Sequence, residues 1–172
     1  MWLLAFLFFL PLGLSAAQPD NQELVQAIHS KDVKRVKKAL RNPKHLNAPA
    51  ANRYTPLMHA AQVGDVEIIK LLLVKGADVS YQTPIPNIES PLTVAIRYKN
   101  AQALKVLLEQ SMKVIPKRTQ DDLPMLLSMA TNSGDAESIK VLLDLGIGAG
   151  DQEMALQNAA NSGNLEAVGM LL

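Results

Sequence analysis

The sequence predicts an all-α solenoid in which five helix-turn-helix repeats stack along one axis, and three observations lead to this prediction. A pattern of polar, apolar and glycine positions returns in copies that begin at residues 22, 55, 90, 125 and 154. Their spacing of 29 to 35 residues indicates stacked repeats and not a single globular core. Only 4% of the residues are aromatic, so Leu, Ile, Val, Ala and Met must build the core, and such cores favour helices over strands. The 17 Lys+Arg and 16 Asp+Glu residues are nearly balanced, as in a folded domain.

The first segment, residues 1–17, is predicted to be a secretory signal peptide. Residues 1–14 contain no charged side chain, and the small residues Ser15, Ala16 and Ala17 follow, so cleavage is expected after Ala17. The run is short for a membrane span and Pro11 interrupts it. Because no Lys or Arg precedes the apolar run, an uncleaved anchor or a hydrophobic N-terminal cap stays open as an alternative.

The clearest repeat begins at Thr55, and its residues predict two helices and the turn between them. Thr55 can cap the first helix, and Pro56 suits its first turn. Gly64 can adopt the left-handed conformation that ends this helix, and Asp65 can cap the next. Gly76 ends the second helix. Apolar residues at helical spacing fill the two helices: Leu57, Ala60, Ala61, Ile68, Ile69, Leu71, Leu72 and Leu73.

The other copies follow the same frame with different regularity. A degenerate first copy fits residues 22–40, the third starts at Ser90, and the fourth covers residues 125–146. The last copy stops at Leu172, before the residues that would end its second helix. Solenoids need polar terminal repeats to stay soluble, so we expect the chain to be part of a longer protein.

Residues 55–78, TPLMHAAQVGDVEIIKLLLVKGAD, resemble an ankyrin repeat. They match the family's T-P-L-H-x-A-A start, its central glycine and its L-L-x-x-G-A-D end, and the resemblance extends over nearly all of the chain from Asn21 onward. It implies an ankyrin-repeat solenoid with short hairpins between repeats. Lys99 and Ser111 stand where the family has glycine, which marks the third repeat as less regular. The expected repeat boundaries are 18–52, 53–87, 88–120, 121–150 and, truncated, 151–172.

The resemblance also implies a binding surface, because ankyrin stacks present their first helices and hairpins on a concave face. The residues expected to contact a protein partner occupy variable first-helix positions and hairpin tips. They are Arg53, Tyr54, His59, Gln62, Val94, Arg97, Tyr98, Met129 and Asn132. Arg and Tyr dominate interface hot spots, so Arg97, Tyr98, Tyr54 and Arg53 are the strongest candidates. Each of them could equally be an ordinary solvated residue.

No residue pattern predicts catalysis, a metal site or a cofactor. The chain has no cysteine, no G-x-S-x-G and no phosphate-binding glycine loop. His29 and His59 fall on neighbouring first helices and could approach each other, but no carboxylate joins them at ligand spacing. Asp121 and Asp122 are interpreted as helix-capping residues at a repeat start.

Charge is uneven along the chain, although the net charge is only +1. Residues 18–52 carry seven Lys+Arg and three Asp+Glu, and most of the basic residues lie within residues 34–41. This basic helix could bind anionic lipid or an acidic partner, but a solvated outer face explains it more simply. The low net charge and the absence of interleaved aromatic residues argue against nucleic-acid binding.

These observations predict an exported scaffold that binds an unidentified protein and has no catalytic activity. The absence of Asn-x-Ser/Thr favours a bacterial periplasmic or secreted protein over a eukaryotic secretory one. A chain without cysteine is also safe in an oxidising compartment. Two alternatives stay open. The repeats could be the targeting arm of a larger enzyme or toxin that continues beyond Leu172, or an adaptor held at the membrane by an uncleaved N-terminal segment.

Overall fold

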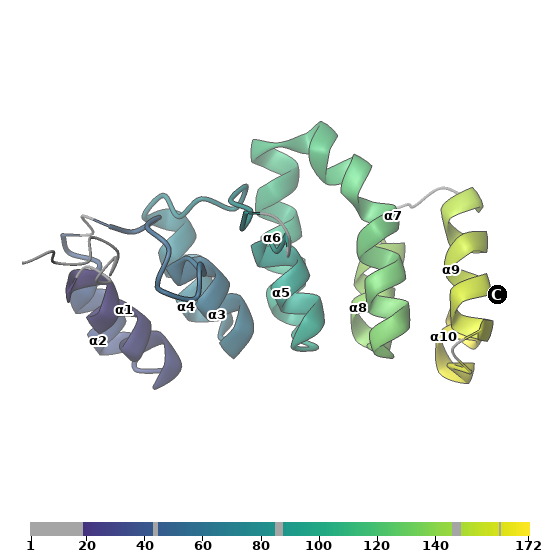
Figure 1. The fold of residues 1–172 in the computed structure, drawn as a ribbon, viewed down its shortest axis with the longest axis horizontal. Helices are drawn as coiled ribbons and strands as arrows, with labels where there is room; N and C mark the ends of the chain where they lie inside the picture. Colours follow the sequence, from purple (N-terminus) through teal and green to yellow (C-terminus); the bar gives the residue numbers. More distant parts are fainter. Residues whose placement is uncertain (1–18, 43–44, 85–87, 146–148, 162) are drawn as a thin grey trace, which may run out of the picture.

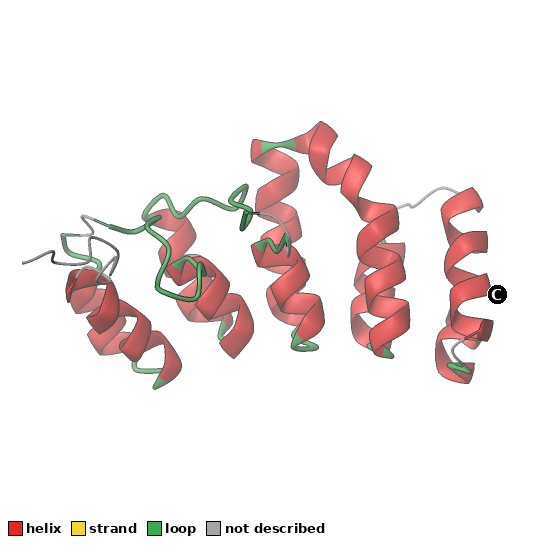
Figure 2. Cartoon of the chain, in the orientation of Figure 1, coloured by secondary structure: helices red, strands yellow, loops and turns green. Residues whose placement is uncertain are grey.

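A computed structural model describes residues 19–42, 45–84, 88–145, 149–161 and 163–172. The predicted signal peptide, residues 1–17, lies outside this part of the chain. The described residues form ten α-helices and no strand (Figure 2). The helices are α1 (Pro19–His29), α2 (Val33–Ala39), α3 (Pro56–Val63), α4 (Val66–Val74), α5 (Pro91–Arg97), α6 (Ala101–Val114), α7 (Pro116–Ser133), α8 (Ala136–Leu143), α9 (Ala149–Asn161) and α10 (Leu165–Leu171). None of the helices in these ranges is long and apolar enough to cross a membrane.

The helices form five antiparallel pairs that stand side by side in chain order (Figure 1). The odd-numbered helices pack on one another as one layer, and the even-numbered helices form a second layer behind them. The main helix contacts join only members of the same pair or of neighbouring pairs. This is the predicted all-α solenoid of helix-turn-helix units.

Alanines let the helices approach closely in the centre of each pair. Ala27, Ala60, Ala95, Ala130 and Ala159 occupy the same position in the five odd-numbered helices, and all are completely buried. Larger residues such as Leu72, Leu107 and Leu142 fill the space between the two layers. The core is therefore one continuous strip that runs the length of the solenoid.

The turn inside every pair uses the same backbone conformation, whatever its residue. A residue with positive φ comes first, and an Asp or Asn that caps or precedes the second helix follows it. The positive-φ residues are Lys31 (53°), Gly64 (76°), Lys99 (54°), Gly134 (65°) and Gly163 (70°). Lys99, which replaces the family's glycine, therefore still adopts the left-handed conformation.

The third and fourth pairs differ from the sequence prediction. Ser111 does not end a helix: it is buried inside α6, and its hydroxyl lies 2.6 Å from that of Thr119 in α7. Only Ile115 separates the two helices, so no hairpin loop is present here. The expected boundary between residues 120 and 121 consequently falls inside α7.

Asp121 and Asp122 also depart from their interpretation as capping residues. Both lie within α7, which begins at Pro116, more than a turn earlier. Asp122 pairs with Arg118 one turn before it, at 3.8 Å, and Asp121 is exposed. Pro116 suits the first turn of a helix, because its missing N–H would have no partner there, and this explains the earlier start.

Candidate partner-binding surface

The candidate surface is the inner-helix face, which we define as the exposed side of α1, α3, α5, α7 and α9 together with the loops 45–55 and 75–84. These longer loops lie at the same end of the helix pairs, at the top of Figure 2. Arg53, Arg97, Tyr98 and Asn132 are exposed on it, as expected. Tyr54, Gln62 and Met129 are half-buried, and Met129 packs against the core.

Two predicted contact residues are buried or nearly so. Val94 is completely buried, so its placement on the exposed face was wrong. The reason is that α5 is flanked by α3 and α7 and covered by α6, which buries all its residues except Arg97. His59 retains only 5% exposure and is part of the buried contact between α1 and α3.

Two of the residues on this face meet at one buried carboxylate. The hydroxyl of Tyr54 donates a hydrogen bond to Glu89 Oε2, and the guanidinium of Arg97 pairs with Glu89 Oε1. The Glu89 side chain is only 7% exposed, whereas that of Arg97 is 54% exposed. Glu89 thus anchors an arginine and a tyrosine that come from different helix pairs.

The backbone around Glu89 is also fixed. Its N–H donates to Thr83 Oγ1 at 2.8 Å, and its carbonyl accepts from the Thr83 N–H at 2.8 Å. Burial, and then the hydrogen bond and charge of Glu89, raise the pKa of Tyr54 to about 12. Tyr54 therefore stays a neutral hydrogen-bond donor throughout the physiological range.

The loop that carries Arg53 is a tight turn held by its own hydrogen bonds. The Tyr54 carbonyl accepts from the Ala50 N–H at 2.8 Å, and the Asn52 side chain accepts from the Tyr54 N–H at 3.1 Å. Arg53 itself has φ of 68°, and its carbonyl accepts from the Tyr81 hydroxyl at 3.3 Å. The Arg53 side chain is thus presented from an ordered backbone.

Glu89 has no signal in the local sequence. Tyr54 lies 35 residues before it and Arg97 is the last residue of the following helix, α5, so no short motif connects the three. Only the repeat frame, which places residue 54 of one repeat beside residue 89 of the next, could have pointed to the contact.

His29 and His59 do approach each other, as their positions on neighbouring first helices predicted. His29 Nε2 lies 2.9 Å from His59 Nδ1, and the rings meet edge to face with centroids 4.9 Å apart. Burial, and then the neighbouring His29, lower the pKa of His59 to about 4, against a smaller opposing effect of Gln62. His59 is therefore neutral at physiological pH. No third His, Cys, Asp or Glu joins them in a metal-binding group within the described ranges.

The basic residues of the first pair lie away from this surface. They belong to α2, in the even-numbered layer, and to the turn that follows it: Lys34, Arg35, Lys37, Lys38 and Arg41. All five are exposed, and Lys37 pairs with Glu67 of α4 at 3.0 Å. They form a separate surface from the one that carries Arg53, Arg97 and Tyr98.

Residues 15–119, more than half of the chain, match the family model described as "Ankyrin repeats (3 copies)". No curated protein matches the chain.

Proposed function

The chain belongs to the ankyrin-repeat family, and from this premise we propose that it is an exported scaffold that binds a protein partner through its inner-helix face. Ankyrin repeats generally mediate protein–protein interaction, and the family is typically non-catalytic. The partner is a protein and not a nucleic acid, because the chain carries a net charge of only +1.

One observation carries this proposal. The inner-helix face carries a cluster of Arg97, Tyr98 and Tyr54. The buried carboxylate of Glu89 holds Arg97 and Tyr54 in place. Arg and Tyr contribute large contact areas and directed polar groups to interfaces. Side chains that are ordered before binding lose less entropy on association, so a small cluster of this kind can anchor a partner.

Photo-crosslinking from Tyr98 tests the proposed surface. A photo-reactive amino acid replaces Tyr98 in the full chain, and a matched protein carries it at Lys70, an exposed position of α4 in the other layer. We expect one partner to be captured from position 98 and not from position 70. Capture from position 70 alone would overturn the choice of face.

A surface substitution then tests the cluster itself. Tyr98→Ala removes an exposed side chain without breaking any contact of Glu89. Partner affinity should fall about 30-fold, corresponding to about 2 kcal/mol for a tyrosine hot spot. Lys70→Ala is the control and should bind as the unaltered protein does. Equal affinity of both variants and the original would contradict the proposal.

Export is the second part of the proposal, and residues 1–17 support it through their apolar run and the small residues that end it. The scaffold then works in the periplasm or outside the cell, and it touches a membrane only if this segment stays attached. N-terminal sequencing of the protein from fractionated cells tests this. A chain that begins at Gln18 in an envelope or medium fraction supports export, and a chain that keeps residues 1–17 in the cytoplasm contradicts it.

A further inference from the structure

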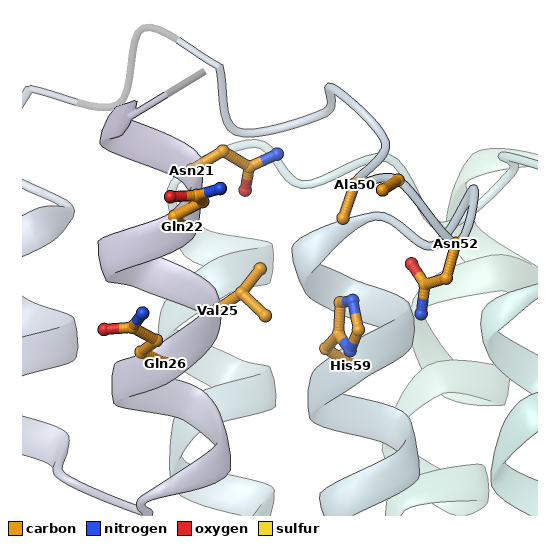
Figure 3. Close-up of a pocket in the computed structure, with 8 residues that line it drawn as sticks. Asn21, Gln22, Val25, Gln26, Ala50, Asn52 and His59 are labelled. Carbon is orange, nitrogen blue, oxygen red and sulfur yellow. The ribbon is translucent and has the colours of Figure 1, made fainter. Parts of the chain in front are cut away.

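A pocket of about 420 Å³ opens on the inner-helix face between α1 and α3. Four of its lining residues come from α1, three from the loop before α3, and one from α3 itself (Figure 3). They are Asn21, Gln22, Val25, Gln26, Ala50, Ala51, Asn52 and His59. The volume falls in the range of pockets that bind small ligands or single side chains.

Two buried polar atoms of this lining have no hydrogen-bond partner among the described residues. They are Asn21 Oδ1 and His59 Nε2, on side chains that are 3% and 5% exposed. Buried polar atoms in folded proteins are nearly always paired, so two orphans in one pocket need an explanation. They belong to opposite walls, Asn21 to α1 and His59 to α3 (Figure 3).

Hydrogen bonds to neighbouring groups determine the orientation of both side chains. Asn21 Nδ2 donates to the Ala48 carbonyl at 2.7 Å, so rotation of the amide would set two acceptor oxygens against each other. His59 Nδ1 is occupied by His29 Nε2 at 2.9 Å. Asn21 Oδ1 and His59 Nε2 are therefore the atoms left for a ligand.

The chemistry of the two atoms limits what the ligand can be. Asn21 Oδ1 only accepts, so the ligand must donate a hydrogen bond to it. His59 Nε2 donates or accepts, according to which of the paired histidines holds the shared proton. A group with an N–H and a C=O side by side can serve both atoms.

The lining also excludes charged ligands. None of the eight described residues that form the pocket is acidic or basic, apart from His59, whose ring is neutral at physiological pH. A carboxylate would face the Asn21 oxygen, and an ammonium would find no opposite charge, so either would lose its hydration without compensation. Val25, Ala50 and Ala51 supply apolar walls for the uncharged remainder of the ligand.

We propose that the pocket between α1 and α3 binds a neutral amide of the partner protein, which donates to Asn21 Oδ1 and hydrogen-bonds to His59 Nε2. The amide is either the side chain of an Asn or Gln, or a main-chain peptide unit of an extended segment. This inference rests on the proposed scaffold function. It specifies which chemical group of the partner the surface recognises.

Nuclear magnetic resonance on the full chain tests this directly, with His59 Nε2 and the Asn21 side-chain amide as reporters. The probes are acetamide for a side-chain amide, N-methylacetamide for a peptide unit, and acetate and methylammonium as charged controls. We expect saturable shifts at both reporters with at least one amide, and at least tenfold weaker responses to the charged probes. The stronger of the two amides identifies the source. Absence of saturable shifts with both amides, or an equal response to acetate, overturns the proposal.

Three variants separate the pocket from general effects on folding. Asn21→Ala and His59→Phe each remove one orphan atom and should weaken amide binding at least tenfold. Val25→Phe fills the pocket and removes no hydrogen bond, so it should block binding even if either of the others fails to fold. Glu23→Ala removes an exposed side chain of α1 that does not line the pocket, and this variant should bind the amide as before. Amide binding that survives Val25→Phe places the site elsewhere and overturns the proposal.

The outcome for the pocket is distinguishable from the outcome for the scaffold. A protein that captures its partner through position 98 but binds no amide keeps the proposed function and overturns this inference. A protein that binds the amide but captures no partner from position 98 keeps the pocket chemistry and overturns the proposed function.

Discussion

At the scale of single residues, Glu89 illustrates how one buried charge organises exposed side chains. Its carboxylate binds Tyr54 and Arg97, while its own backbone is held by Thr83. Such a group is invisible to local patterns, because its partners come from other segments. The exposed positions of Arg53, Arg97, Tyr98 and Asn132 could be predicted from the repeat frame, but the buried groups beneath them could not.

Glu89→Gln should reveal this role. The substitution removes the charge that Arg97 pairs with, and it should lower the free energy of unfolding by about 1 to 2 kcal/mol. It also removes the charge that helps to raise the pKa of Tyr54, so this pKa should fall from about 12 toward its ordinary value of 10.0. Tyrosine ring resonances followed against pH measure the shift. An unchanged Tyr54 pKa would show that burial alone sets it.

His59 should make the stability of the protein depend on pH. Its pKa is about 4 in the folded protein and 6.5 in its unperturbed state, so the unfolded chain binds the proton more tightly. Stability should therefore be complete above pH 6.5 and fall by about 2 kcal/mol as the pH decreases through this window toward 4. Denaturant unfolding at several pH values measures the change.

His59→Gln is the matched control for this effect, because glutamine is polar but does not titrate. The difference in unfolding free energy between the original protein and this variant should shrink as the pH falls from 6.5 to 4. A difference that stays constant across the window would assign the acid sensitivity to other groups.

At the scale of the elements, the turn inside each pair needs one residue in the left-handed conformation, and either glycine or lysine occupies this position. Gly64 adopts it without strain, and its missing Cβ leaves room for Asn100, whose Oδ1 would lie 2.5 Å from such an atom. Lys31 and Lys99 adopt the same left-handed conformation with a side chain present. A left-handed residue other than glycine costs about 1 to 2 kcal/mol.

Lys99→Gly should consequently stabilise the protein. The relief of strain exceeds the extra backbone entropy of glycine in the unfolded chain, and the net gain should be about 0.5 to 1 kcal/mol. Thermal unfolding measures it, and the melting temperature should rise. Lys99→Ala removes the same charged side chain but keeps the strain, so an equal gain from alanine would contradict the explanation.

The junction between α6 and α7 shows where element prediction from the repeat pattern fails. The pattern could anticipate the helix pairs, because capping residues and glycines recur at fixed spacing. It could not anticipate that a serine in place of glycine lets α6 run on to Val114, or that Pro116 starts α7 immediately afterwards. Where a repeat lacks the glycine that ends its second helix, helix propensity and packing determine where that helix ends.

At the scale of the whole molecule, contacts between neighbouring pairs determine how the solenoid holds together. Asn100 Nδ2 donates to the carbonyls of Ala61 and Gln62, each at 2.9 Å, and Asn164 Nδ2 donates to the Thr131 carbonyl at 3.1 Å. These bonds satisfy carbonyls at the end of the first helix of the preceding pair, α3 for Asn100 and α7 for Asn164. The equivalent positions Asp32, Asp65 and Asp135 carry carboxylates, which cannot donate such a bond.

Asn100→Asp should weaken the junction between the second and third pairs. The new carboxylate loses both hydrogen bonds and faces the carbonyl oxygens of Ala61 and Gln62, which should lower stability by about 2 kcal/mol. Because a solenoid is stabilised pair by pair, denaturant unfolding should also broaden or split into two transitions. Asn132→Asp adds the same charge at an exposed position and should leave the curve unchanged. A single, unshifted transition in Asn100→Asp would contradict this account.

The asparagine bonds also make the completion of one helix pair depend on residues that are synthesised later. Each asparagine completes a helix that precedes it, so α3 keeps open carbonyls until Asn100, 36 residues after Gly64, has been made. At a synthesis rate of about 5 to 20 residues per second, this interval lasts a few seconds. During that time the growing end of the solenoid is its least complete part. The second pair is completed by Asn100 of the third, and the fourth pair by Asn164 of the fifth. Under the export that we propose, a machinery that keeps the chain unfolded would compete with this ordered closure and not with one all-or-none collapse.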